Sequence, residues 1–227
     1  MHHQHLHWGN QAADLALTDE AAFVEVRENT ADMDALEARF VGKLQGRGLV
    51  QAWHDFSSQM ATHFDKADPK KRLKWFGPDM SARSSITARL MESWSHAQAI
   101  WDILGKERSN DDGLKNICTI GINTYGWTYA VRKMNPPGPM PWVKLAAPSS
   151  KAVWTWGEEN DKNWIEGSAA EFCQVVTQCR NIKDTGLTVH GPVAESWMAN
   201  AQCFAGPPND PPPPGLRRMA AAASSRL

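Results

Sequence analysis

Apolar side chains between residues 79 and 105 recur at steps of three and four, the spacing of the buried stripe on an amphipathic helix. The stripe consists of Ile86, Leu90, Trp94, Ala97, Trp101 and Leu104. Asp79 or Ser81 can accept hydrogen bonds from the N–H groups of a first turn, and Gly105 suits a left-handed helix end. The pattern therefore predicts one long helix over residues 79–105. Its polar face would carry Ser84, Thr87, Ser95, Gln98 and Asp102.

Helical spacing also predicts helices before and after this segment. They cover residues 1–16, 32–45, 49–64 and 113–134. Gly46 and Gly48 separate two of these helices and indicate a kink or a tight link. The proline-rich segment 135–141 ends the last helix and marks a domain boundary, because proline lacks the N–H that a helix interior needs.

After this proline-rich segment the hydrophobic pattern changes from helical to alternating. Strands are expected over residues 142–147, 153–156, 164–166 and 187–190, and helices over 169–179 and 193–204. The last part of the chain has too little apolar surface to form a core, so we expect it to be disordered. The prediction is an α+β protein with three parts. These are a helical domain (residues 1–134), a small α+β domain (residues 135–206) and a disordered tail (residues 207–227).

Composition narrows the class of protein. The formal net charge of the 227 residues is −1, which argues against a general nucleic-acid-binding surface. No apolar run approaches the roughly 20 residues that cross a bilayer, and no signal peptide is recognisable at the start. The four cysteines include no Cys-x-x-Cys pair and suggest reduced thiols. We therefore expect a cytoplasmic protein with no membrane partner.

Glu92 and His96 lie one helical turn apart on the flank of the apolar stripe, so their side chains can point at one spot. A carboxylate and an imidazole in this position suit a divalent metal ion, which would offset the cost of burying them. The alternative is an ion pair of Glu92 with Arg89 or His96 on a half-wet surface. Four of the first seven residues are histidines. They are further candidate ligands, although a tag-like start or a free N-terminus that binds copper or nickel would also explain them.

Two blocks of the sequence resemble the mycothiol-dependent maleylpyruvate isomerase superfamily. One is Trp-Phe-Gly-Pro-Asp-Met-Ser-Ala-Arg-Ser at residues 75–84, and the other is Ala-Arg-Leu-Met-Glu-Ser-Trp-Ser-His at residues 88–96. More closely, the chain resembles an actinobacterial branch of metal-binding proteins. The fold of that branch is the DinB-like four-helix bundle, and its C-terminal region is similar to the wyosine base formation domain. The second similarity is carried by residues 172–178, 187–189 and 201–208.

The resemblance implies a metal held by a histidine of the second bundle helix and by a glutamate and a histidine one turn apart on a later helix. These positions fall on His5, Glu92 and His96, with His7 as the alternative to His5. The family has a first helix and the start of the second before this histidine, and both are absent here. Either the start of the chain is misassigned, or the bundle is incomplete and exposes an apolar seam, which a homo-oligomer could bury.

Two imidazoles and one carboxylate leave a divalent ion with an open coordination position, as in catalytic sites. Zinc is the default ion for this set, with nickel, cobalt and iron as alternatives. The resemblance implies that mycothiol or a similar low-molecular-weight thiol is activated there for isomerisation or S-transfer on a small carboxylate. Arg83 and Arg89 are the nearest candidates to hold that carboxylate. Alternatively, Arg89 orients Glu92, and Arg83 pairs locally.

Two other classes of function compete with this hypothesis. The C-terminal similarity carries a tRNA-modification (wybutosine) label. However, the sequence has no set of iron–sulfur cysteines, no basic stripe and no recognisable aromatic–basic platform, and these absences argue against a nucleic-acid partner. A non-catalytic module that holds a metal or a thiol is the third class.

Overall fold

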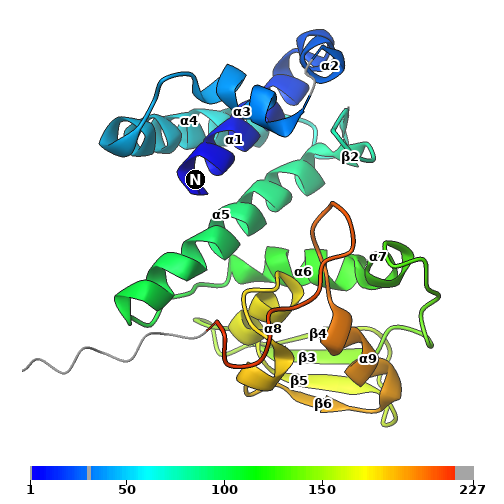
Figure 1. Cartoon of the computed structure of the whole chain (residues 1–227). Helices are drawn as coiled ribbons and strands as arrows, with labels where there is room; N and C mark the ends of the chain where they lie inside the picture. Colours follow the sequence, from blue (N-terminus) through cyan, green and yellow to red (C-terminus); the bar gives the residue numbers. More distant parts are fainter. Residues whose placement is uncertain (1, 30–31, 218–227) are drawn as a thin grey trace, which may run out of the picture. The chain divides into compact units, whose positions relative to one another are not determined.

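The computed structural model describes residues 2–29 and 32–217, and its chain forms two compact units, Met1–Ser93 and Trp94–Leu227 (Figure 1). The limit between the units falls inside the long helix α5 (Ala82–Leu104), which therefore contributes residues to both. The structure confirms the predicted α+β class, because the first unit is mainly helical and the second combines helices with a sheet.

The first unit is built around α1 (His2–Thr18), which packs against the three helices that follow it. These are α2 (Glu20–Glu28), α3 (Met33–Val41) and α4 (Gly46–Lys66). The core side of α1 is lined by Trp8, Ala12, Ala13, Ala16 and Leu17. The small alanine side chains allow neighbouring helices to approach closely, so α1 can be covered on several sides.

A short antiparallel hairpin leads from α4 into α5. It consists of β1 (Arg72–Leu73) and β2 (Met80–Ser81), and the sequence pattern did not predict it. The loop between the two strands places Trp75 flat against Phe23, with ring centroids 5.9 Å apart, and Phe76 edge-on to Trp8. These aromatic contacts anchor the start of α5 on the core of the first unit.

The helix predicted over residues 79–105 is confirmed as α5. The Ser81 hydroxyl accepts a hydrogen bond from the N–H of Ser84 (3.1 Å) at its start, and Gly105 adopts φ +61° at its end. The predicted buried stripe is wrong in part, because Leu90 and Leu104 are 42% and 57% exposed whereas Gln98 is buried. The two halves of α5 belong to different units, so its buried positions do not form one continuous arc.

The second unit contains a four-stranded sheet in the order β4-β3-β5-β6. The strands are β3 (Trp142–Ala146), β4 (Val153–Trp156), β5 (Trp164–Ser168) and β6 (Thr188–His190). β3 and β5 pair in parallel, whereas the two outer pairings are antiparallel. All four predicted strands are therefore confirmed, with β4 unchanged and one end of each other strand shifted by one or two residues.

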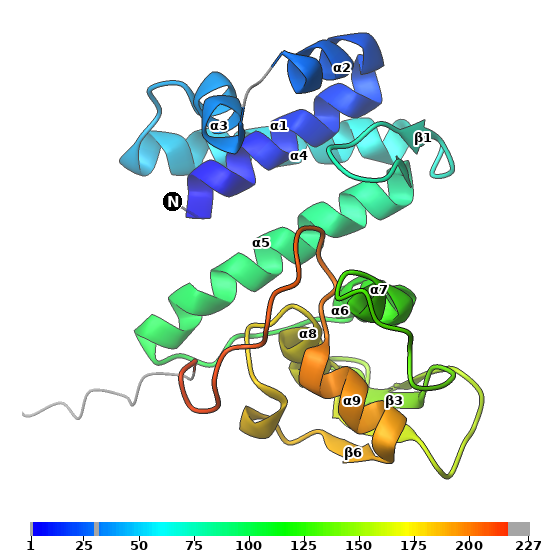
Figure 2. The ribbon, with the colours of Figure 1, turned by 45° about the vertical axis from the view of Figure 1, so that its right-hand side comes forward.

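The helices of the second unit lie against this sheet and against each other (Figures 1 and 2). They are α6 (Leu114–Asn123), α7 (Tyr125–Ala130), α8 (Ala169–Val176), the short 3₁₀ helix η1 (Ile182–Asp184) and α9 (Pro192–Asn200). The single helix predicted over residues 113–134 is interrupted at Thr124, whose φ and ψ are −98° and 11°. The buried sheet residues Val143, Leu145 and Ile165 share this core with Phe172 and Trp197.

The proline-rich segment 135–141 was predicted to mark a domain boundary. The proline-rich segment 135–141 lies within the second unit, because α6 packs against α8 and α7 packs against α9. The boundary at residues 134 and 135 therefore stays a prediction.

The first half of the predicted tail differs from the disorder expected of it. Within residues 207–217, the Asn209 amide donates to the side chain of Gln178 (2.6 Å), and the Asn181 amide donates to the carbonyl of Pro212 (2.9 Å). The remaining residues of the predicted tail, 218–227, lie outside the described part of the chain.

The four cysteines, which we expected to be reduced thiols, are free and buried in the second unit. The sulfur atoms of Cys118 and Cys173 lie 3.5 Å apart. Burial and the neighbouring Cys118 raise the pKa of Cys173 well above its usual value. These thiols are thus packed as small apolar groups.

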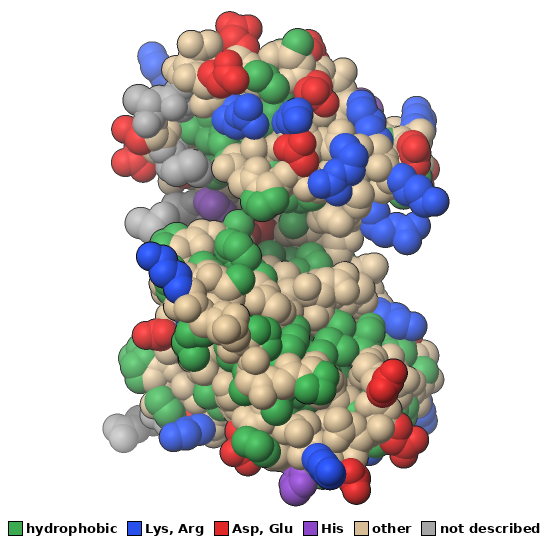
Figure 3. Space-filling view, turned by 90° about the vertical axis from the view of Figure 1, so that its right-hand side faces the viewer, with side chains coloured by type: hydrophobic (Ala, Val, Ile, Leu, Met, Phe, Trp, Pro, Cys, Tyr) green, Lys and Arg blue, Asp and Glu red, His purple; other side chains and the backbone are tan. Residues whose placement is uncertain are grey.

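No helix in residues 2–29 and 32–217 combines the length and apolar character needed to cross a membrane. On the face shown in Figure 3, side chains of Lys and Arg are interspersed with those of Asp and Glu.

Candidate metal centre

His5 lies in the first turns of α1 and is oriented by the aromatic residues beside it. Its ring meets Trp8 edge-on, with centroids 5.5 Å apart, and Trp8 in turn packs edge-on against Phe76 at 5.9 Å. Trp8 is 5% exposed, whereas the side chain of His5 is 38% exposed. A buried tryptophan therefore supports an imidazole that solvent can still reach.

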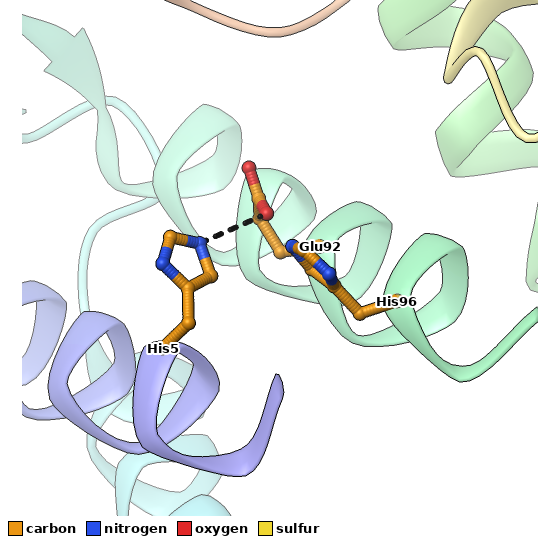
Figure 4. A group of neighbouring side chains, drawn as sticks. All are labelled: His5, Glu92 and His96. Atoms are coloured by element: carbon orange, nitrogen blue, oxygen red, sulfur yellow. Dashed lines mark ion pairs between the residues drawn. The ribbon is translucent and has the colours of Figure 1, made fainter. Parts of the chain in front are cut away.

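Glu92 and His96 come from α5 and point toward the same spot as His5 (Figure 4). The Nε2 atom of His5 lies 3.4 Å from Oε2 of Glu92. One ligand atom from each of the three residues lies within 4.8 Å of the other two, and all three residues are half-buried. The turn of helix between Glu92 and His96 thus brings both side chains to the flank that faces His5, as their spacing predicts.

This arrangement fits a divalent ion. Two ligand atoms about 2.0–2.1 Å from a tetrahedral zinc ion would lie roughly 3.3–3.4 Å apart, close to the separation between His5 and Glu92. The set of two imidazoles and one carboxylate matches zinc and also suits nickel, cobalt or iron. Because the three side chains are only half-buried, a further ligand could approach from solvent.

Arg89 is buried beside this group, one turn before Glu92. Its guanidinium carbon lies 5.3 Å from the centroid of the Trp75 ring. Burial lowers the pKa of Arg89, and the nearby charge of Glu92 opposes that effect. With only 8% of its surface exposed, Arg89 is better placed to orient the Glu92 carboxylate than to meet a substrate.

Arg83 occupies a different position. It is an exposed residue in the first turn of α5. Glu92 lies nine positions further along the helix, which corresponds to about 13–14 Å along the axis. The structure therefore brings together His5, Glu92 and His96, buries Arg89 about one turn before Glu92, and leaves Arg83 further along the helix.

His7, the alternative to His5, has different surroundings. It is 4% exposed and meets Phe56 of α4 edge-on at 6.0 Å. Burial lowers its pKa. His63 of α4 pairs with the buried Asp14 of α1, with its Nδ1 atom 2.8 Å from Oδ1. Only non-local contacts reveal this pair, because the two residues belong to different helices.

Residues 3–101 match the family described as the mycothiol maleylpyruvate isomerase N-terminal domain, and this stretch contains all three converging side chains. The chain belongs to the mycothiol-dependent maleylpyruvate isomerase superfamily. The resemblance carried by residues 75–84 and 88–96 is thereby confirmed. The match ends at residue 101, so the similarity of the second unit to a wyosine base formation domain stays a prediction.

Two relatives match this superfamily member over most of both chains. It is 34% identical over 211 residues to an uncharacterized protein of Mycobacterium tuberculosis found in strain ATCC 25618 / H37Rv, and equally to one in strain CDC 1551 / Oshkosh. Each alignment covers 90% of this chain and 80% of the relative. Alignments of this length must include most of the second unit. No solved structure matches the chain.

Proposed function

We propose that this superfamily member binds a divalent cation through His5, Glu92 and His96 and acts with a low-molecular-weight thiol on a small carboxylate substrate. The reaction would be an isomerisation or an S-transfer. The observation that carries the proposal is the convergence of these three side chains within 4.8 Å. Mycothiol is the thiol that membership of the superfamily suggests.

When bound, a divalent ion with three protein ligands supplies an open coordination position that lowers the pKa of a thiol or water. The protein's own residues would prepare this position. His5 and Glu92 approach from different helices, so the packing of α1 on the hairpin loop sets the distance between them. The half-exposed side chains leave a path for the thiol.

Arg89 would act as a positioning residue in this proposal. Its guanidinium lies over the Trp75 ring and interacts electrostatically with Glu92. Arg89 would therefore keep the Glu92 carboxylate charged and directed at the ion. Arg83 is exposed and could attract an anionic substrate by long-range charge, but its distance along α5 separates it from the three ligands.

Metal binding by the full chain tests the proposal directly. Wild-type protein stripped of metal and titrated with zinc by calorimetry should bind about one ion per chain. His96→Ala removes a ligand, and its affinity should fall by more than the roughly 10- to 100-fold typical of changes next to a metal ligand. His54→Ala is a matched control, because His54 lies on the exposed side of α4.

Wild-type protein that stays metal-free with zinc, nickel, cobalt and iron would contradict the proposal, as would unchanged zinc affinity in His96→Ala.

The alternative role, a non-catalytic module that holds a metal or a thiol, uses the same residues. Metal-loaded protein given a thiol and a cis-unsaturated dicarboxylate separates the two, because a binding module would bind the thiol without converting the acid. The tRNA-modification alternative stays a prediction that rests on the second unit.

A further inference from the structure

The sheet of the second unit has one face turned away from its core. Val143 and Leu145 point into the core, so the alternation of strand residues places Trp142 and Lys144 on the opposite face of β3. The parallel pairing sets Trp142 directly opposite Trp164 of β5. Two indole rings therefore lie side by side on the open face, although the residues are distant in sequence.

A third ring extends this row. Trp164 pairs with His190 of β6, and their rings stack with centroids 5.5 Å apart at an angle of 23°. His190 is the last residue of β6. Only strand pairing assembles this row, because the three residues are distant in sequence.

The two tryptophans form part of a cavity of about 450 Å³, here called the indole pocket. Its other walls come from Lys144 and from the loop between β4 and β5. The complete lining is Trp142, Lys144, Glu159, Asn160, Asp161 and Trp164. None of the six lining residues is one of the three metal-ligand candidates.

An ammonium group already lies over both indole rings. The Nζ atom of Lys144 is 4.7 Å from the centroid of Trp142 and 5.7 Å from that of Trp164. It also lies 2.5 Å from Oε2 of Glu166, whose side chain is 52% exposed. The ring faces are thus arranged where they stabilise a cation, and Glu166 offers Lys144 a partner outside the rings.

The charges around the indole pocket favour a cationic ligand over an anionic one. Glu159 and Asp161 line the pocket, and Glu166 balances Lys144, so carboxylates outnumber the single ammonium group. The side-chain oxygen of Asn160 already accepts hydrogen bonds from the backbone N–H groups of residues 162 and 163, which reduces its use for reading sugar hydroxyls.

We propose that the indole pocket binds a small organic cation of the methylated-ammonium class. The ligand would place its methyl groups on Trp142 and Trp164 and its charge toward Glu159 and Asp161, while Lys144 leaves the ring faces and keeps Glu166 as its partner. An ammonium that carries methyl groups suits this pocket because it is weakly hydrated and covers indole faces with apolar surface. No covalent bond is made or broken when this ligand binds.

Choline chloride titrated into the full chain tests the proposal, with the indole N–H signals of Trp142 and Trp164 followed by NMR. The matched ligand is 3,3-dimethyl-1-butanol, which has nearly the same shape without the charge. We expect choline to shift both indole signals and the neutral analogue to shift them far less. Sodium chloride at equal ionic strength controls for salt.

Variants of the pocket sharpen the test. Trp142→Ala should weaken choline binding about tenfold, and Trp142→Phe should retain most of it because a ring remains. Lys144→Met removes the competing ammonium and should strengthen binding several-fold. Val153→Ala is the control, because Val153 is 65% exposed on the neighbouring strand and is not part of the pocket lining.

Equal shifts with choline and its neutral analogue would overturn the proposal. So would methyl glucoside shifting the same two indole signals when choline does not, since this would identify a sugar site. Should Trp142→Ala fail to fold, the Lys144→Met and Trp142→Phe variants still decide, because unchanged choline affinity in Lys144→Met contradicts displacement of the resident ammonium.

Discussion

Arg89 shows how one residue can link the core of the first unit to the candidate metal centre. A buried guanidinium is costly unless charge and packing compensate it, and here the Glu92 charge and the Trp75 ring offset part of that cost. Gly9 on α1 makes room for this arrangement. A Cβ atom at that position would lie only 2.3 Å from Nη1 of Arg89.

Gly9→Ala should therefore displace the Arg89 guanidinium. We expect a loss of stability of about 1–2 kcal/mol, the usual cost of overpacking, together with weaker zinc binding because Glu92 loses its neighbour. Urea unfolding and zinc calorimetry measure the two effects.

Gly48→Ala is the matched control. Gly48 lies in α4 with nothing within 4 Å of an added Cβ, so alanine there should stabilise by about 0.5–1 kcal/mol. Equal stability and zinc affinity in the two variants would show that Arg89 does not depend on the space at Gly9.

Single elements also depend on polar contacts that their own sequence does not reveal. Asp112, just before α6, binds the turn between β3 and β4. Its Oδ1 atom accepts hydrogen bonds from the Ser149 hydroxyl (2.8 Å) and from the backbone N–H of Ser150 (3.3 Å). Hydrogen bonds from Ser150 and Ser149 lower the pKa of Asp112 to about 2.

Asp112→Asn should reduce stability in a pH-dependent way. Because the pKa is lower in the folded protein than in the unfolded chain, the charged carboxylate stabilises the fold above about pH 4, and this contribution is lost as the pH falls toward 2. Urea unfolding of the variant and the wild type should therefore differ most near neutral pH and converge near pH 2. Glu107→Gln, which changes an exposed carboxylate in the preceding linker, should leave the pH profile unchanged.

Which residues of α5 are buried also depends on contacts with other elements. Its buried residues near the start, Ala82, Ser85 and Arg89, belong to the first unit, whereas Trp94 and Gln98 belong to the second. Leu90, Ile100, Ile103 and Leu104 are exposed large apolar residues on this helix. A homo-oligomer that covers such apolar surface stays a prediction.

At the scale of the whole molecule, a buried ion pair connects two segments of the second unit that are distant in sequence. Arg180 donates two hydrogen bonds to the Asp102 carboxylate, at 2.7 Å and 2.5 Å. Their side chains are 9% and 14% exposed. This bidentate pair joins the end of α5 to the segment after α8.

Asp102→Asn should lower the free energy of unfolding by about 2–3 kcal/mol, because it leaves the Arg180 guanidinium buried without its counter-charge. Adding Arg180→Met should recover part of that loss, since the unpaired charge is then removed. Chemical denaturation of both variants provides the measurement. The exposed pair of Lys74 and Asp79 is the comparison, and Asp79→Asn should have little effect. An Asp102→Asn variant as stable as the wild type would exclude a structural role for the pair.

The sequence by itself determined the elements that depend on local geometry. Periods of 3.6 and 2 residues located most of the helices and all four strands of the main sheet. Of the two predicted caps, Asp79 and Ser81, the structure selects Ser81, and Gly105 ends α5 as predicted. The spacing of Glu92 and His96 likewise predicts that both lie on one flank, because four residues make one turn. The family resemblance added His5, which no local pattern connects to α5.

Only the tertiary structure decided which surfaces these elements bury and which distant residues meet. The exposure of Leu90, the burial of Gln98 and the row formed by Trp142 and Trp164 follow from packing and strand register. Periodicity indicates which side of a single helix or strand is apolar. Contacts between elements depend instead on the free energy of packing the whole chain. The approach of His5 to Glu92 is such a contact, since residues on two separate helices form it.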